Sequence, residues 1–214
     1  MTSVIFDWSG VVKDAVHAQL WILNRMLERC GLPPIALGEL QENWEQPYML
    51  FYRKYLPDSF DVTEQATAYR ELLFRDDCPR SSAYPGMVDL VRRLNKEGSF
   101  LAVVSSDLAE SLGAEMKEYG LEGVFDEIVT DVPDKLDAVR AIVEKNGLSP
   151  DETFFVGDSN HEIDVAHKTG IRSVATTWGF TSETKLLAYQ PDVIVHNALE
   201  LEEAIGGHAR KRPR

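Results

Sequence analysis

Six short runs of apolar and β-branched residues constrain the fold of this chain more than any other feature. They occupy residues 4–6, 100–104, 127–129, 154–156, 173–177 and 193–195. The runs are continuous and do not alternate with polar residues, as expected of strands that are covered on both faces. This pattern favours a buried parallel sheet.

Helical patterns separate the later runs. Leu108, Leu112 and Met116 share one face, after a helix cap expected at Ser106 or Asp107. A second apolar stripe, between residues 134 and 147, consists of Leu136, Val139, Ile142 and Val143. Because strands alternate with such helices, the sequence predicts an α/β fold with a doubly wound, Rossmann-like parallel sheet.

The interval 14–83, between the first run and the second, contains no convincing strand. Helical stretches are expected within it at residues 16–30, 38–56 and 63–76, the second of them broken by Pro47. A normal crossover between parallel strands needs roughly a dozen residues, so this interval is far too long to be one. We therefore expect it to form an inserted helical cap domain.

The chain is then expected to have three parts. Its 214 residues are enough for a core of ordinary size that carries a smaller insertion. The predicted core comprises residues 1–13 and 84–205, and the predicted cap comprises residues 14–83. The basic residues 206–214 are expected to form a disordered tail.

Charge and cysteine content exclude several classes of protein. The formal net charge of −13 argues against a nucleic-acid binder, although a local basic pocket can still hold a small anion. Cys30 and Cys78 are the two cysteines, and neither stands at zinc-site spacing. No apolar run is long enough for a membrane helix. We expect a cytoplasmic protein, monomeric or dimeric.

Four polar residues stand where a ligand site is expected. Asp7, Ser105 and Asp158 each follow a predicted strand, and Lys135 opens a predicted helix. In open α/β sheets, ligands bind outside the carboxyl ends of the strands. An aspartate can act as a nucleophile, a hydroxyl and an ammonium can hold phosphoryl oxygens, and paired carboxylates bind divalent cations. Together these residues predict phosphoryl transfer through an aspartyl intermediate.

Four segments also carry a resemblance to a known family. "VIFDWSG" (4–10), "LAVVSSD" (101–107), "PDKLDAV" (133–139) and "FFVGDSNHEID" (154–164) resemble, in order, the four motifs of the haloacid dehalogenase superfamily of hydrolases. The segment "YPGMVDLVRRLNKEG" is similar to the phosphoglycolate-phosphatase-like branch. The resemblance implies hydrolysis of a small phosphorylated metabolite with Mg²⁺, under a helical cap of the family's first type.

The resemblance implies roles for the matched positions. Asp7 would attack phosphorus. The phosphoryl group would be held by Ser105, Ser106, Lys135 and Gly10. Mg²⁺ would be bound by Asp7, Asp158, Glu162 and the main-chain carbonyl of Ser9.

Ser9 is the main departure from the family pattern. This position normally carries a second aspartate, which protonates the leaving group and later activates water. A positioned acid or base contributes about a hundredfold to ten-thousandfold in rate, and a serine hydroxyl does not carry that proton. We therefore predict that Ser9→Asp raises turnover on unactivated esters by about tenfold or more. Val11, in place of the usual threonine, and Glu162, in place of the usual aspartate, are milder changes.

Three functional hypotheses follow from Ser9. The first is a phosphatase that is slow on poor leaving groups. The second is a phosphonatase-like enzyme, because that branch has a tryptophan after the nucleophile and a small residue at this position. Such an enzyme needs a cap lysine, and Lys54 is the one in the interval; its simpler interpretation is a solvated charge. The third is a binding or regulatory module with little or no turnover.

Further residues have two interpretations each. Glu162 is either a metal-site ligand or a surface helix acid. His161 is either a proton shuttle or a solvent-facing loop residue, and the latter is favoured. The aromatic residues of the cap either line a substrate pocket or form the cap's own core, namely Trp44, Tyr48, Phe51 and Tyr52.

Overall fold

A six-stranded parallel sheet forms the centre of the molecule. The computed structural model describes residues 2–209, with side chains described up to residue 206. The strands lie in the order β5-β4-β1-β6-β7-β8, and their bounds are β1 Ser3–Phe6, β4 Phe100–Val104, β5 Glu127–Val129, β6 Thr153–Gly157, β7 Arg172–Thr176 and β8 Val193–Val195. β1 therefore lies between β4 and β6, which the chain reaches in opposite directions. This is the topological switch point of the sheet.

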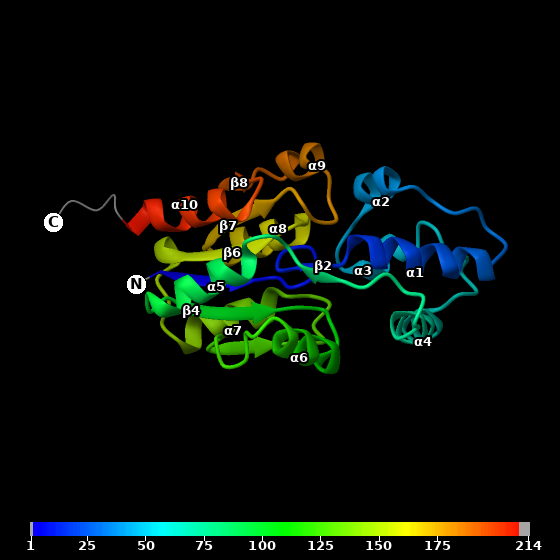
Figure 1. Cartoon of the computed structure of the whole chain (residues 1–214). Helices are drawn as coiled ribbons and strands as arrows, with labels where there is room; N and C mark the ends of the chain where they lie inside the picture. The colour runs from blue at the N-terminus through cyan, green and yellow to red at the C-terminus, as the bar shows by residue number, and fades with distance from the viewer. Residues whose placement is uncertain (1, 210–214) are drawn as a thin grey trace.

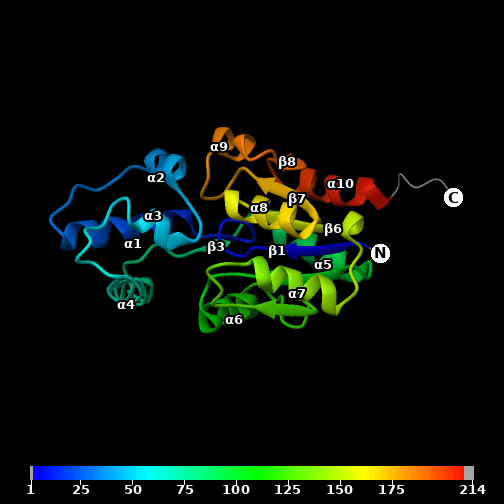
Figure 2. The ribbon, with the colours of Figure 1, turned by 180° about the vertical axis from the view of Figure 1, so that it is seen from behind.

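Helices cover both faces of the sheet. α5 (Met87–Lys96), α6 (Ala109–Glu118) and α10 (Ala198–Ala209) pack on one face, and α7 (Leu136–Lys145) and α8 (Asn160–Thr169) pack on the other. Figures 1 and 2 show these two layers from opposite sides. Val4 and Phe6 contribute to the first layer and Ile5 to the second, because successive strand residues point to opposite faces. The predicted doubly wound fold is confirmed.

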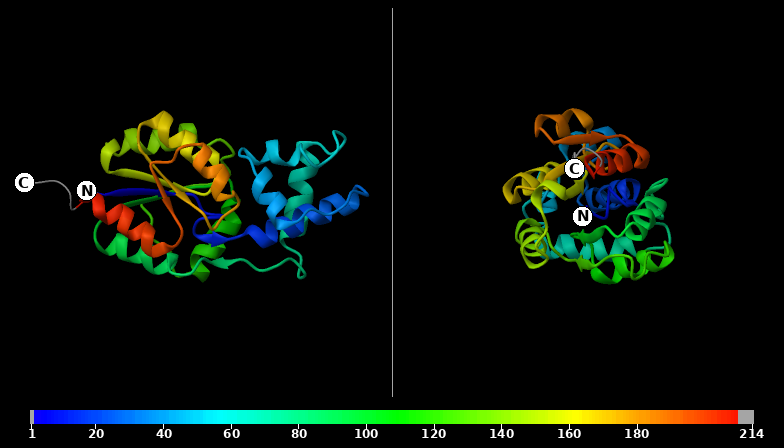
Figure 3. Two further views of the ribbon diagram at one scale, coloured as in Figure 1. Left: turned by 90° about the horizontal axis from the view of Figure 1, so that it is seen from above. Right: turned by 90° about the vertical axis from the view of Figure 1, so that its left-hand side faces the viewer.

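A separate group of helices follows β1, and we call it the helical unit. It consists of α1 (Val16–Arg29), α2 (Leu37–Asn43), α3 (Tyr48–Tyr52) and α4 (Val62–Leu73). These helices pack around an apolar cluster of their own, which includes Ile22, Met26 and Phe51. Figure 1 and the left view of Figure 3 show the unit projecting from one end of the sheet layers.

Two short strands join the helical unit to the sheet. β2 (Lys13–Asp14) and β3 (Ser82–Ala83) pair antiparallel, so the chain leaves the sheet and returns to it through one two-stranded connection. The sequence analysis did not predict these strands, because two residues are too short for a periodic signal. The remaining elements are α9 (Glu183–Ala188) and a 3₁₀ turn at Pro150–Glu152.

The structure corrects three predicted boundaries. The helical stretch expected at residues 38–56 is two separate helices, α2 and α3. The helix α10 runs on to Ala209, past residue 205, because Leu201 and Ile205 anchor it in the core and the last turn follows. The predicted tail therefore starts too early, and its residues 210–214 lie outside the described residues. None of the helices within residues 2–209 has the length and apolar character needed to span a membrane.

The third correction concerns the start of α6. The sequence predicted a cap at Ser106 or Asp107, but the N-cap residue is Leu108, which makes no side-chain capping hydrogen bond. The first turn of α6 thus begins without the Asp107 carboxylate. The Asp107 carboxylate instead accepts hydrogen bonds from the hydroxyls of Ser9 and Ser105.

Candidate active site

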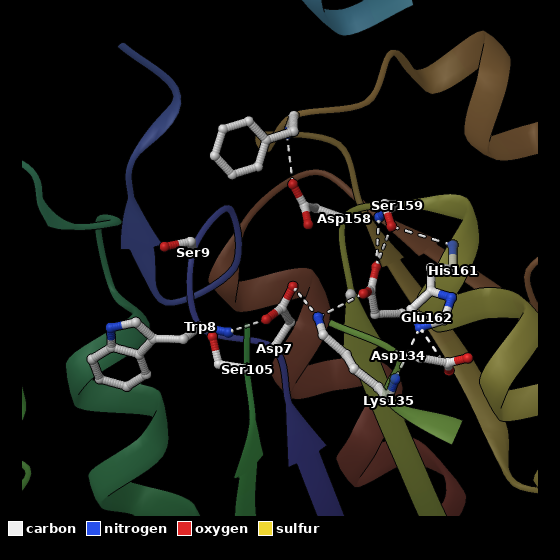
Figure 4. A network of polar contacts seen from close by, with 12 residues as sticks. Asp7, Trp8, Ser9, Ser105, Asp134, Lys135, Asp158, Ser159, His161 and Glu162 are labelled. Carbon is white, nitrogen blue, oxygen red and sulfur yellow. Dashed lines mark hydrogen bonds and ion pairs between the residues drawn. The ribbon is translucent and has the colours of Figure 1, made fainter. Parts of the chain in front are cut away.

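The carboxyl ends of the central strands bring the predicted residues together. Asp7 directly follows β1, Ser105 follows β4 and Asp158 follows β6. Lys135 is the N-cap residue of α7. Figure 4 shows Asp7, Lys135 and Glu162 joined in one row, with Asp158 beside them. We call these four residues, Asp7, Lys135, Asp158 and Glu162, the buried charge cluster.

Lys135 links two of the carboxylates. Its Nζ lies 2.7 Å from Asp7 Oδ2 and 2.7 Å from Glu162 Oε1, and its side chain is 0% exposed. Burial by itself would lower the pKa of Lys135, but the two carboxylates outweigh burial and raise it. The ammonium is therefore held charged in a water-free position, where it can pair with an anion.

The cluster carries more negative charge than Lys135 can balance. One oxygen each of Asp7, Asp158 and Glu162 lies within 4.8 Å of the others. Burial raises the pKa of Asp7 to about 7, against the opposing effect of Lys135. Burial, reinforced by the neighbouring carboxylates, raises the pKa of Asp158 well above its usual range. Three buried carboxylates against one ammonium are a donor set that fits a hard divalent cation.

Glu162 is fixed by two sets of hydrogen bonds. Lys135 binds Oε1, and Oε2 accepts hydrogen bonds from the hydroxyl of Ser159 at 2.5 Å and from the main-chain N–H of Ser159 at 3.1 Å. The second set forms a capping box at the start of α8. Glu162 is 1% exposed, so its interpretation as a surface acid is wrong. Lys135 outweighs the opposing effect of burial and lowers the pKa of Glu162.

His161 is not a solvent-facing loop residue. It lies in the first turn of α8, its side chain is 12% exposed, and its Nε2 accepts a hydrogen bond of 3.1 Å from the main-chain N–H of Lys135. Burial lowers the pKa of His161, which keeps Nε2 available as an acceptor. His161 therefore positions the start of α7, and with it Lys135.

Gly10 makes room for Asp158. A Cβ atom at Gly10 would lie 2.1 Å from Asp158 Oδ2, and its φ of +88° is a left-handed conformation that favours glycine. The main-chain N–H of Gly10 donates to the carbonyl of Lys13 at 2.8 Å. The prediction that Gly10 binds phosphate is therefore wrong for its N–H group, which is already bonded within the loop.

The structure places Asp107, which the sequence analysis treated as a candidate helix cap, in the lining of the cavity described below. The hydroxyl of Ser9 donates to Asp107 Oδ2 at 2.7 Å, and the hydroxyl of Ser105 donates to the same oxygen at 3.1 Å. Residues 9 and 107 are 98 positions apart, so sequence spacing gave no signal of this contact. We call Ser9 and Asp107 the Ser9–Asp107 pair.

A cavity of about 130 Å³ lies between the sheet edge and the helical unit. On the sheet side, its lining includes Asp7, Ser9, Ser106 and Asp107. On the helical side, it includes Gln19, Tyr52, Gln65, Tyr69 and Arg70, which we call the cavity wall. Asp7 is 4% exposed, and the cavity is where a substrate can reach it.

The four predicted aromatic residues of the helical unit contribute to its apolar cluster, and three of them also line the cavity. Trp44, Phe51 and Tyr52 are buried in the apolar cluster of the helical unit, and Tyr48 packs against it. Trp44, Tyr48 and Tyr52 also line the cavity. The two interpretations of these residues are therefore compatible.

Lys54 stands outside this arrangement. Its Nζ pairs with Glu45 at 2.6 Å and donates to the carbonyl of Asn43 at 3.0 Å, and its side chain is 38% exposed. It is absent from the described lining of the cavity. This geometry fits the solvated charge better than a lysine that forms an imine with a substrate.

The family model of the haloacid dehalogenase-like hydrolases matches residues 4–176. This range contains all of β1 but its first residue, the helical unit and the whole buried charge cluster. The chain belongs to this hydrolase family. The match confirms the resemblance drawn from the four motifs.

Known proteins are similar to this chain over two thirds or more of its length. A phosphoglycolate phosphatase of Synechococcus elongatus is 25% identical over 209 residues, which cover 96% of this chain and 97% of the relative. Pyrophosphatase PpaX of Bacillus mycoides is 26% identical over 149 residues, which cover 67% of this chain and 69% of the relative. The solved structure of a haloacid dehalogenase-like hydrolase of Streptococcus pneumoniae shares the fold, with a TM-score of 0.78 and 22% sequence identity. The match covers 94% of this chain and 96% of that structure.

Proposed function

We propose that this hydrolase is a Mg²⁺-dependent phosphatase of small phosphate monoesters, acting through an aspartyl phosphate on Asp7. One observation carries the proposal. The Asp7 carboxylate lies at the floor of a cavity, 2.7 Å from a buried ammonium and within 4.8 Å of two further carboxylates. This arrangement combines a nucleophile, an anion partner and a cation site at one point.

The residues divide the chemistry between them. Asp7 attacks phosphorus, and the ammonium of Lys135 pairs with the negative charge on the phosphoryl group. Ser106, which lines the cavity, would offer its hydroxyl and main-chain donors to the phosphoryl oxygens. The predicted role of Ser105 is limited to its hydroxyl, which donates to Asp107, because its main-chain N–H donates to the carbonyl of Val129 at 2.9 Å. Mg²⁺ would be held by Asp7, Asp158 and Glu162, with the carbonyl of Ser9, and would neutralise charge on the phosphoryl group. The role of Ser9 stays a prediction from the family pattern.

The helical unit supports a cap role for residues 14–83. It is joined to the sheet through the β2 and β3 connection, and it supplies the cavity wall opposite Asp7. A cavity of about 130 Å³ suits a small metabolite better than a protein or a polymer. We therefore infer that the cap selects small substrates and excludes water from the phosphorylated intermediate.

A substrate screen tests the proposal. Phosphate release is measured with and without Mg²⁺ on a panel that includes phosphoglycolate and pyrophosphate, the substrates named by the relatives, and 4-nitrophenyl phosphate. Asp7→Asn should abolish release. Asp137→Asn, whose side chain is 94% exposed on α7, is the matched control and should keep full activity. Activity that survives Asp7→Asn would refute the proposal.

The same experiment separates the regulatory hypothesis. Beryllofluoride binding at Asp7 without turnover on any panel member would favour a binding or regulatory module. Ordinary turnover on one member would reject that module.

A further inference from the structure

Phe180 belongs to the sheet side of the chain, yet its side chain is buried in the helical unit. It lies between β7 and α9, in residues 177–182, which we call the docking segment. The other buried residues described in the apolar cluster around Phe180 lie at positions 15–78. The ring of Phe180 stacks on Trp44, with 4.4 Å between the ring centroids and 19° between the planes. Phe180 and Trp44 are 4% and 3% exposed, so the two rings shield each other from water.

The main chain of the same residue holds one of the carboxylates of the buried charge cluster. The N–H of Phe180 donates to Asp158 Oδ2 at 2.6 Å, and this is the one hydrogen bond recorded for the Asp158 side chain within residues 2–206. The other two carboxylates of the cluster are held by Lys135 instead. The approach is close, because a Cβ atom at Gly179 would lie 2.1 Å from Asp158 Oδ2. The docking segment therefore orients Asp158.

Hydrogen bonds also tie the docking segment to the helical unit. Gln41 Nε2 donates to the carbonyl of Gly179 at 3.2 Å, and the carbonyl of Gln41 accepts from the N–H of Ser182 at 3.2 Å. Just after the segment, Lys185 Nζ donates to the carbonyl of Trp44. Each of these bonds joins the helical unit to the sheet side, so all of them break if the unit moves away from the sheet.

We propose that Trp44 and Phe180 are positioning residues for the cation site, and that this site binds Mg²⁺ most tightly when the helical unit is docked on residues 177–182. The inference rests on the cation site of the proposed function. When the unit withdraws, the ring of Phe180 loses its cover and enters water, which favours rearrangement of the docking segment. The N–H group that orients Asp158 moves with it. Groups that orient a metal ligand contribute about tenfold to a hundredfold in metal affinity.

The coupling acts in both directions. If docking raises the affinity for Mg²⁺ by some factor, Mg²⁺ stabilises the docked unit by the same factor. Both stacked rings also line the cavity, so the contact that encloses a substrate is the contact that orients Asp158. Phe180 links the two events, because its side chain contacts the helical unit and its main chain contacts the cation site.

Isothermal titration calorimetry with Mg²⁺, in the absence of substrate, tests the inference. Trp44→Leu removes the stacked ring and should weaken Mg²⁺ binding by about tenfold. Trp44→Phe keeps an aromatic ring and should restore an affinity close to native. Trp21→Leu is the matched control, because Trp21 packs against the same apolar cluster but its ring lies beside Arg25 and Arg75. This control should keep the native Kd. Native affinity in Trp44→Leu, or an equal loss in both leucine variants, would overturn the inference.

Hydrogen exchange tests the reverse direction and does not depend on Trp44 variants that fold. Gln41 of α2 is bonded to the docking segment, so firmer docking should protect α2. In the native protein, Mg²⁺ without substrate should slow exchange in α2 peptides by about fivefold or more. In Phe180→Ala, which keeps the N–H but loses the ring, Mg²⁺ should leave α2 unchanged. Exchange in native α2 that ignores saturating Mg²⁺ would contradict the coupling.

The calorimetry also separates this inference from the proposed function. If the native protein binds Mg²⁺ and Trp44→Leu binds it equally well, the inference fails while the proposed phosphatase stands. If the native protein binds no Mg²⁺, the cation site of the proposed function fails, and the inference with it.

Discussion

The buried charge cluster reaches the cavity through Asp7, opposite the cavity wall, and the two regions differ in how far their polar groups are paired. In the cluster, Lys135 is fully buried between two carboxylates at 2.7 Å each. In the wall, Arg70 is exposed, and Gln65 carries a buried Oε1 that has no hydrogen-bond partner among the described residues. The ammonium of the cluster is paired before a substrate binds, whereas the wall keeps one buried acceptor, Gln65 Oε1, to satisfy.

In the proposed phosphatase, this difference assigns the chemistry to the cluster and the substrate selectivity to the wall. A preorganised charge cluster stabilises the phosphoryl group whatever the rest of the substrate is. In the proposed phosphatase, the wall would contact the part of the substrate that varies. We therefore expect cluster substitutions to change stability and turnover, and wall substitutions to change apparent affinity.

The largest effect is expected from Lys135→Met. Removing the ammonium leaves the carboxylates of Asp7 and Glu162 buried without their shared partner, which should cost about 3–5 kcal/mol of unfolding free energy. Urea denaturation in EDTA measures this cost. Lys145→Met is the control on the same helix, because Lys145 is 69% exposed and should contribute little. Equal stability of the two variants would contradict the account of the cluster.

The next effect concerns Mg²⁺ and pH. The raised pKa values of Asp7 and Asp158 mean that the metal-free folded protein keeps protons that the unfolded chain releases above about pH 4. Stability without metal should therefore decline as pH rises from about 4 through 7. Mg²⁺ competes with those protons, so its stabilising effect should grow over the same range and reach about 2.7 kcal/mol at a concentration of a hundred times Kd.

Thermal denaturation at pH 5 and pH 8, with EDTA or Mg²⁺, measures this linkage. Asp158→Asn is the control, because it removes one cation ligand and should reduce the Mg²⁺ response at pH 8. A Mg²⁺ response of the same size at both pH values would argue against these carboxylates as its ligands.

A smaller effect is expected in the wall from Gln65→Ala. Gln65 lines the cavity, and its buried Oε1 can accept a hydrogen bond from a substrate. Losing one such bond corresponds to about tenfold, so KM should rise by about that factor with kcat nearly unchanged. Steady-state kinetics separate the two constants, and Thr67→Ala, an exposed change on the same helix, is the control. A fall in kcat with constant KM would place Gln65 with the cluster instead.

The smallest effect is expected from Ser9→Asp as a single change. The sequence predicts a gain of about tenfold or more on unactivated esters, but the contact with Asp107 revises this expectation. A carboxylate at position 9 would replace a hydroxyl that donates to Asp107 Oδ2 at 2.7 Å, and the two neighbouring negative charges would repel each other. We now expect turnover to change by less than about threefold. A gain of tenfold or more in this single variant would show that position 9 lacks a proton donor.

The sequence predicted the buried charge cluster better than it predicted the cavity wall. Asp7, Lys135 and Asp158 were found because strand ends in a parallel sheet meet at one edge, and their order matches four family motifs. Asp107 was assigned to a helix cap, since a serine or an aspartate before a helix usually caps it. Its true partner lies 98 residues away across the sheet, and local patterns carry no such information.

The wall was less predictable still. Tyr52 was recognised, but Gln19, Gln65, Tyr69 and Arg70 were not. These polar residues lie on α1 and α4, and the packing of the two helices against each other decides which of them face the cavity. Helical periodicity predicts which side of a helix is buried and which is exposed. It does not predict which polar residues face a cavity next to the sheet.

The central claim is that Asp7 becomes phosphorylated, and chemical trapping tests it most directly. The enzyme is mixed with substrate and Mg²⁺, quenched in acid within milliseconds and reduced with borohydride, which converts an aspartyl phosphate to homoserine. Peptide mass spectrometry should find homoserine at residue 7, dependent on substrate. Sustained phosphate release with an unmodified residue 7, or with homoserine at another aspartate, would contradict the account.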